Sequence, residues 1–183
     1  MRNLYLISHS QLGSHTIEVK ASKFADWKRL LSIHLDGAFL TTRAVLQRMY
    51  KQGTGGSIIY MGSVHSKEAS LLKAPYVTAK HGLIGLTKVL AAEWASHNVR
   101  VVCLDPGYIR AGLGIKGQTR GAFSAEDIER RTPMGRLGTP ADIGNVVALF
   151  CSDKARWITG QVIYADGGAS LMNPEVPPET QIG

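Results

Sequence analysis

Residues 57–61 read SIIYM, a short apolar run with two adjacent isoleucines, and Ser63 follows it after a single glycine. Runs of this length that are rich in β-branched and aromatic residues indicate strands buried on both faces. Residues 99–104 (VRVVCL) and 161–165 (QVIYA) have the same character, and residues 4–7 (LYLI) form a weaker fourth candidate. The sequence therefore predicts four short strands in the interior of the molecule.

Segments with helical periodicity lie between these strands. Residues 25–51 and 76–97 repeat apolar side chains three and four positions apart, and Pro75 is placed at the first helical position of the second segment. Residues 141–151 are predicted as a third helix, with Thr139 as its N-cap. Strands that alternate with helices predict a parallel sheet covered on both faces. Right-handed crossovers then leave a doubly wound α/β arrangement.

Length and composition limit the class of protein. The chain has 183 residues and a mass of 19.8 kDa, and 44% of its residues are hydrophobic, which is enough to bury the core of one domain. We expect that domain to cover residues 1–172 and a loose, proline-rich tail to follow at 173–183. No apolar run approaches the roughly 20 residues of a membrane-spanning helix. The only cysteines, Cys103 and Cys151, argue against a disulfide framework. We therefore expect a cytoplasmic protein that is not bound to a membrane.

The charge of the chain indicates the kind of ligand. Lys and Arg number 21 and Asp and Glu number 14, a formal net charge of +7. The basic residues are scattered along the chain, and acidic residues dilute the densest basic stretch, residues 110–136. Nucleic-acid binding requires basic charge gathered on one element with aromatic side chains between, so we expect no nucleic-acid partner. The charge favours a small anionic ligand, and no metal site is predicted.

Three polar residues are predicted to meet at one end of the sheet. Ser63 follows the strand 57–61 at its carboxyl end, where open α/β sheets place their ligand crevices. Tyr76 and Lys80 are four positions apart at the start of a helix, so they project from the same face. The Lys80 ammonium and the positive end of the helix are expected to lower the pKa of the Tyr76 phenol below about 10, which makes it a general acid/base. The alternative is a surface Tyr and Lys on an amphipathic helix and a Ser in a turn.

With their surroundings, these residues resemble the short-chain dehydrogenase/reductase family. Ser63 stands thirteen residues before the Y-x-x-x-K formed by Tyr76 and Lys80. A Pro-Gly pair follows one predicted strand, a Thr-Gly pair precedes the last strand, and Asp-Gly-Gly ends it. The resemblance covers about residues 17–172. Within the family, the 3-hydroxybutyrate dehydrogenases are most similar to residues 32–42 (SIHLDGAFLTT) and 60–70 (YMGSVHSKEAS).

The resemblance implies an oxidoreductase that transfers a hydride between a nicotinamide cofactor and a secondary alcohol or ketone. NAD is the expected cofactor, with NADP as the alternative, and the expected substrate is a short 3-hydroxy acid or the matching keto acid. The resemblance also implies a homo-oligomer that forms through the helices 25–51 and 76–97. A different hypothesis is a catalytically incompetent fragment that acts as a non-catalytic partner subunit.

The family's roles carry over to single positions of this sequence. Tyr76 would be the acid/base, Lys80 would hold the nicotinamide ribose and polarise Tyr76, and Ser63 would orient the reacting oxygen. In the 3-hydroxybutyrate subgroup a His and a Lys bind the substrate carboxylate. The remaining candidates are Pro106, Gly107 and Ile109 around the nicotinamide, and His65, Lys73 and Gln118 at the substrate.

Two of these assignments have simple alternatives, and one position departs from the family. His65 could be a turn residue bonded to the backbone, and Lys73 could be a solvated side chain. The usual Asn of the catalytic tetrad is His34 in this sequence. A ring nitrogen of His34 could hold the proton-relay water. The alternative is a helix residue packed against a neighbouring backbone.

The family's sheet runs in the order 3-2-1-4-5-6-7. Alignment places residues 4–7 on the fourth of these strands, so we expect an N-terminally truncated Rossmann-like fold without the family's first three strands and their glycine-rich phosphate turn. Residues 112–117 (GLGIKG) match the dinucleotide-binding pattern, but they follow the Pro-Gly pair and do not join a strand to a helix. We interpret them as part of a substrate lid.

Overall fold

The computed structural model of the chain describes residues 3–7, 18–111 and 123–171. Its centre is a parallel sheet of four strands that stand in chain order, β1-β2-β3-β4. The predicted parallel α/β sheet is confirmed, and the bounds of each strand differ from the prediction by at most two residues. The strands are β1 (Asn3–Ile7), β2 (Gly56–Met61), β3 (Val99–Pro106) and β4 (Val162–Ala165).

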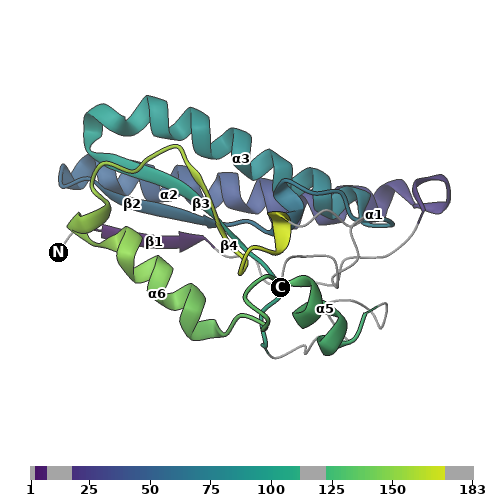
Figure 1. The fold of residues 1–183 in the computed structure, drawn as a ribbon. Coiled ribbons are helices and arrows are strands. Elements are labelled where there is room, and N and C mark those ends of the chain that lie inside the picture. The colour runs from purple at the N-terminus through teal and green to yellow at the C-terminus, as the bar shows by residue number, and fades with distance from the viewer. Residues whose placement is uncertain (1–2, 8–17, 112–122, 172–183) are drawn as a thin grey trace.

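Helices cover both faces of the sheet (Figure 1). One face carries α2 (Gly37–Gln52) and α3 (Ala74–Trp94), and the opposite face carries α6 (Pro140–Cys151). A short helix that the periodicity does not predict, α5 (Ala125–Arg131), lies beyond the carboxyl ends of the strands. The arrangement is therefore doubly wound, as the alternation of strands and helices predicts.

The predicted helix over residues 25–51 is divided in the structure. It consists of α1 (Phe24–Leu31), a π-helical turn (Ser32–Asp36) and α2 in direct succession. A π-helical turn adds a residue to the helix and is frequent at functional sites. Apolar spacings of three and four residues fit a helix with or without such an insertion, so the sequence pattern does not reveal it.

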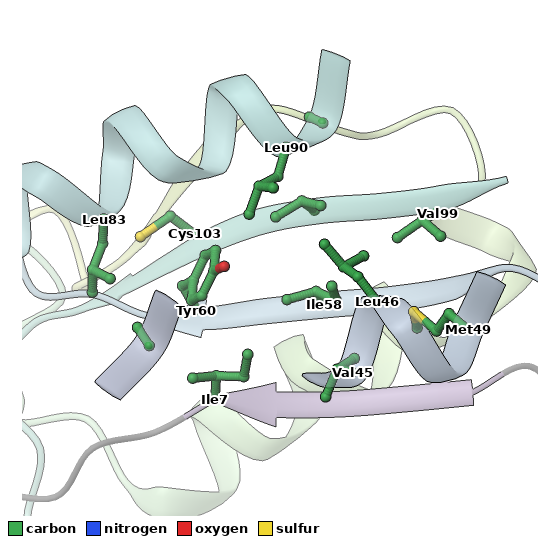
Figure 2. Packing of buried hydrophobic residues seen from close by; sticks show 13 residues of the cluster. Ile7, Val45, Leu46, Met49, Ile58, Tyr60, Leu83, Leu90, Val99 and Cys103 are labelled. Carbon is green, nitrogen blue, oxygen red and sulfur yellow. The ribbon is translucent and has the colours of Figure 1, made fainter. Parts of the chain in front are cut away.

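The core on the first face lies between the sheet and the helices α2 and α3 (Figure 2). Side chains of β2 and β3 that point to this face are fully buried, and the Tyr60 hydroxyl shares a hydrogen bond with the Thr42 hydroxyl of α2. The buried members of this cluster are Ile7, Ala38, Val45, Leu46, Met49, Ile58, Tyr60, Leu83, Leu90, Ala91, Val99, Val101 and Cys103.

On the second face, a buried arginine joins the sheet to the end of α6. The Arg100 guanidinium, on β3, donates hydrogen bonds to the carbonyl oxygens of Phe150 and Ala155, each over 2.8 Å, and to the Ser57 hydroxyl over 2.7 Å. Those carbonyls lie at the carboxyl end of α6 and just beyond it, where a helix leaves its acceptors unpaired. Arg100 therefore fixes α6 against β2 and β3.

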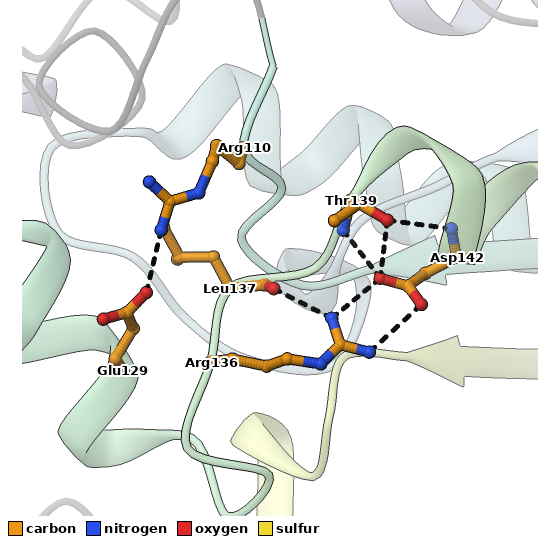
Figure 3. Close-up of polar contacts among 6 residues, drawn as sticks. All are labelled: Arg110, Glu129, Arg136, Leu137, Thr139 and Asp142. Carbon is orange, nitrogen blue, oxygen red and sulfur yellow. Dashed lines mark hydrogen bonds and ion pairs between the residues drawn. The ribbon is translucent and has the colours of Figure 1, made fainter.

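The segment between α5 and α6 is held by ion pairs and a capped helix start (Figure 3). As predicted, Thr139 is the N-cap of α6: its hydroxyl accepts a hydrogen bond from the Asp142 amide, and the Asp142 carboxylate accepts one from the Thr139 amide. Arg136 donates to both oxygens of that carboxylate, over 2.8 and 3.1 Å. Arg110 pairs with Glu129 of α5 over 3.0 Å.

The register of the sheet brings the ends of β2 and β3 together. Met61 is paired with Leu104, and the Gly62 amide donates to the Leu104 carbonyl over 2.8 Å. A Cβ at Gly62 would lie 1.8 Å from Oδ1 of Asp105, so only glycine allows the chain to leave β2 at this distance. The residues that follow each strand therefore meet at one edge.

Candidate active site

Ser63 begins a short turn directly beyond β2. It is the N-cap of the 3-10 turn Val64–Ser66, and its hydroxyl accepts a hydrogen bond from the His65 amide over 3.2 Å. The Ser63 amide donates to the Ser66 hydroxyl over 3.3 Å and to Asp105 Oδ1 over 3.2 Å. We call this segment the 63–66 turn. Its contacts fix the Ser63 backbone and leave the Ser63 hydroxyl free to donate.

The structure brings Tyr76 and Lys80 to Ser63. Both side chains come from the first turns of α3, and the Tyr76 phenol is hydrogen-bonded to the Ser63 side chain. Lys80 is only 5% exposed, its Nζ lies 5.5 Å from the centre of the Tyr76 ring, and it donates to the Met61 carbonyl over 2.7 Å. The alternative of a surface Tyr and Lys on an amphipathic helix is wrong, because Lys80 is buried and Tyr76 is partly buried.

The predicted pKa of Tyr76 is wrong in direction. Burial raises the pKa of the Tyr76 phenol above its ordinary value of 10.0, the Ser63 hydrogen bond lowers it, and the Asp105 and Tyr108 side chains raise it further. Burial also lowers the pKa of Lys80 to about 8, although Cys103 and Asp105 oppose that shift. Desolvation of the phenol, rather than the Lys80 charge, dominates at this position.

Two histidine rings contact Tyr76 edge to face. His34, in the π-helical turn, is 3% exposed and its ring centre lies 5.4 Å from that of Tyr76. The His65 ring lies 6.1 Å from Tyr76. Burial and the nearby Lys73 ammonium lower the pKa of His65 to about 4, so its imidazole is neutral at neutral pH. A neutral ring offers one N–H donor and one acceptor.

The remaining predicted residues are only partly brought into this site. Gly107 follows β3, and a Cβ there would lie 2.8 Å from Cα of Asp166, so the chain beyond β4 packs directly on it. Ile109 forms a parallel bridge with Gly138 and lies farther along the same segment as Pro106. Gln118, residues 112–117 and the tail at 173–183 lie outside the described residues.

Asp105 belongs to this site but was not among the predicted residues. Its side chain is 0% exposed and accepts a hydrogen bond from the Ser63 amide. One signal in the sequence points to it: an ionisable residue directly follows the apolar residues 101–104 of a predicted strand. Charged residues are rarely buried without a partner, so such a position indicates a role at the strand's end.

The other predictions from composition concern membranes and cysteines. Among the helices that the structure describes, none is long and apolar enough to cross a membrane. Cys103 is buried, Cys151 is half-buried, and both are free thiols.

Known proteins with a similar sequence or fold indicate the family of this chain. The family model described as enoyl-(acyl carrier protein) reductase matches residues 7–170. The 3-oxoacyl-[acyl-carrier-protein] reductase FabG of Aquifex aeolicus is 38% identical over 147 residues, which cover 78% of this chain and 56% of that protein. The crystal structure of acetoin dehydrogenase from Enterobacter cloacae matches with a TM-score of 0.83 and 31% identity, over 96% of this chain and 67% of that one.

A second similar structure contains a cofactor. It is a 4-hydroxyisoleucine dehydrogenase mutant complexed with NADH and succinate, with a TM-score of 0.83 and 28% identity over 93% of this chain and 69% of that one. The fold is that of a Rossmann-like α/β protein. The chain belongs to the short-chain dehydrogenase/reductase family. It spans between 54% and 60% of the length of the first curated relatives that it matches.

Proposed function

We propose that this chain carries the reaction centre of an oxidoreductase that interconverts a secondary alcohol and a ketone. The convergence of Ser63, Tyr76 and Lys80 at the carboxyl edge of the sheet supports this assignment. The Tyr76 phenol donates its proton to the ketone oxygen in reduction, and the Tyr76 phenolate accepts a proton from the alcohol in oxidation. The Ser63 hydroxyl donates a hydrogen bond to the same oxygen and holds it beside Tyr76.

A nicotinamide cofactor supplies or accepts the hydride when it is bound. The buried Lys80 ammonium has three N–H donors, and Met61 uses one of them. The other two would hold the nicotinamide ribose, with Pro106, Gly107 and Ile109 on the nicotinamide side. Among residues 3–7, 18–111 and 123–171, no G-x-G-x-x-G turn joins a strand to a helix, so these ranges contain a place for the nicotinamide but no cradle for the pyrophosphate.

NAD is the proposed cofactor and NADP the alternative. The similar 4-hydroxyisoleucine dehydrogenase structure holds NADH and another similar structure holds NADP, which supports a nicotinamide cofactor, and the choice of NAD follows the resemblance to 3-hydroxybutyrate dehydrogenases. In the family, a residue after the second strand of the sheet distinguishes NAD from NADP. The described residues correspond to the later strands and do not include that position. In the proposed arrangement, β1 takes the place of the fourth strand of the family's sheet.

The proposed substrate is a short 3-hydroxy acid or its 3-keto partner. His65 contacts Tyr76, and the Lys73 ammonium lies close enough to lower the pKa of His65. A neutral imidazole N–H and an ammonium beside the acid/base would together bind a carboxylate. The relative that reduces 3-oxoacyl groups supports a substrate oxidised at carbon 3. His34 would hold the water that returns the proton to Tyr76.

A homo-oligomer through α2 and α3 completes the proposal. A shallow apolar groove runs between these helices, and Phe39, Leu40 and Val89 on its walls are each more than half exposed. A Cβ at Gly85 would meet no atom within 4 Å, which leaves room for the backbone of a neighbouring helix. We expect Val89→Glu to shift the chain to monomer in analytical ultracentrifugation. An unchanged mass would contradict this interface.

The experiment for the proposed function is a fluorescence titration with NADH, followed by a hydride-transfer assay with 3-hydroxybutyrate and acetoin. We expect saturable binding and turnover in the unchanged chain, and loss of turnover of at least about a hundredfold in Tyr76→Phe. Tyr50→Phe, at an exposed position on α2, is the matched control and should retain the full rate. Equal rates for the two variants would overturn the assignment of Tyr76. The relatives reported above are named as enzymes, which does not favour the alternative of a non-catalytic subunit.

A further inference from the structure

Asp105 is a buried carboxylate directly beneath the 63–66 turn. It is the penultimate residue of β3, and its side chain points to the same face of the sheet as that of Cys103. It is fully shielded from solvent. A carboxylate in this environment costs free energy unless hydrogen bonds and an opposite charge compensate it.

The hydrogen bonds of Asp105 hold both ends of the 63–66 turn. Oδ1 accepts from the Ser63 amide over 3.2 Å, and the Ser66 side chain is hydrogen-bonded to the same carboxyl group. The Cys103 thiol donates to Oδ1 over 3.2 Å from within the same strand. Gly62 allows this approach, because any Cβ there would collide with Oδ1. The turn is therefore attached to β3 through one side chain.

The nearest opposite charge comes from α3. Burial raises the pKa of the Asp105 carboxyl group, and the Lys80 ammonium opposes that shift, as Asp105 opposes the lowering of the Lys80 pKa by burial. Lys80 itself donates to the Met61 carbonyl at the end of β2. Lys80 thus links α3 to β2 at the point where the reacting groups converge.

One feature of Asp105 goes beyond what packing requires. Its second oxygen, Oδ2, is buried and has no hydrogen-bond partner among the described residues. Such orphaned atoms are rare in native proteins and lower stability. A residue kept at this cost has a role that an apolar side chain would not fill.

We propose that Asp105 is a positioning residue for Ser63: its side chain holds the 63–66 turn at both ends and keeps the Ser63 hydroxyl beside Tyr76. The effect of Asp105 on catalysis rests on the proposed function, since no hydrogen bond joins Asp105 to Tyr76. The structural role of Asp105 in holding the 63–66 turn does not depend on the proposed function. The Ser63 amide should be protected from exchange because it donates a hydrogen bond to Asp105 Oδ1.

Hydrogen exchange of the full chain, followed by NMR at single amides, tests whether Asp105 holds the 63–66 turn. Asp105→Ala removes the acceptor, and we expect the Ser63 amide to exchange at least about tenfold faster. Asp105→Asn keeps an oxygen at the same place and should stay within about threefold of the unchanged chain. The amide of Leu83 in α3 and the variant Asp26→Asn serve as controls for the fold. If Asp105→Ala does not fold, Asp105→Leu fills the space without an acceptor and takes its place.

Unchanged protection of Ser63 in both Asp105→Ala and Asp105→Leu would overturn the proposal. Hydride transfer supplies the second readout. We expect Asp105→Ala to lower kcat by about ten- to a hundredfold with little change in KM, and Asp105→Asn to recover most of that loss. If Asp105→Ala lowered kcat only by destabilising the fold, the Asn side chain of Asp105→Asn would not restore kcat. If the unchanged chain does not turn over substrate, the proposed function fails. The exchange result still decides whether Asp105 holds the 63–66 turn.

Discussion

The Lys80 ammonium donates a hydrogen bond to the carbonyl oxygen of Met61 over 2.7 Å, and this bond joins the first turns of α3 to the last residue of β2. Lys80 is thereby fixed before any ligand arrives, and its charge is held within the protein rather than in water. Preorganised charge of this kind favours catalysis because it needs no reorganisation during the reaction. The same burial has a cost that changes with pH.

The free energy of unfolding should rise between pH 8 and 10.5 because of Lys80. Burial lowers the pKa of Lys80 from 10.5 to about 8. Between these values the unfolded chain binds the proton and the folded chain does not, so stability increases as pH rises, by about 3 kcal/mol at most. Lys80→Met should remove this rise from urea unfolding curves, and Lys88→Met, at an exposed position on α3, should keep it. The same pH dependence in both variants would contradict the burial of Lys80.

Tyr76 should remain a neutral phenol up to pH 10 in the chain without ligand. Burial raises the pKa of this group, and the neighbouring Asp105 adds to the shift. The measurement is the ¹³Cζ signal of labelled tyrosine, with Tyr76→Phe to assign the resonance. A Tyr76 signal that changed to the phenolate position below pH 9 would show that the Lys80 charge dominates after all. If Tyr76 stays neutral as expected, any lowering of its pKa during catalysis has to come from the bound cofactor or substrate.

This difference for Tyr76 shows what the sequence can and cannot predict. The apolar runs and the Y-x-x-x-K spacing predict the four strands and the meeting of Ser63, Tyr76 and Lys80, because both depend on local periodicity. The direction of a pKa shift depends on how much water the folded chain excludes, and that is a property of the tertiary structure. The π-helical turn at His34 and the bonds of Asp105 are missed for the same reason, since both depend on what packs against them.

His65 should make the chain less stable at acidic pH. Its pKa is lowered to about 4 by burial and by Lys73, while an unfolded chain keeps a value near 6.5. Below pH 6.5 the unfolded state binds a proton at His65 that the folded state does not bind. The free energy of unfolding therefore falls as pH drops to 4, by roughly 3 kcal/mol at most. Unfolding of His65→Gln at pH 4.5 and 7 should show a smaller loss. His81→Gln, at an exposed histidine of α3, should behave like the unchanged chain, and an equal loss in all three would contradict the prediction.

Arg100 should be needed for the attachment of α6. Its guanidinium serves the carbonyls of Phe150 and Ala155 and the Ser57 hydroxyl at once, and it is only 7% exposed. Arg100→Met leaves these buried acceptors without their donor, and we expect a loss of about 2–4 kcal/mol in the free energy of unfolding.

Arg100→Lys should recover little of that loss, because one ammonium does not reproduce the planar fork that reaches the backbone carbonyls and the Ser57 hydroxyl together. Arg156→Met, at an exposed arginine just beyond Ala155, is the control and should stay within about 0.5 kcal/mol of the unchanged chain. Hydrogen exchange localises the effect: the amides of α6 should lose protection first, while those of α3 on the opposite face of the sheet keep theirs. Uniform loss of protection across both helices would mean that Arg100 supports the whole sheet rather than the attachment of α6.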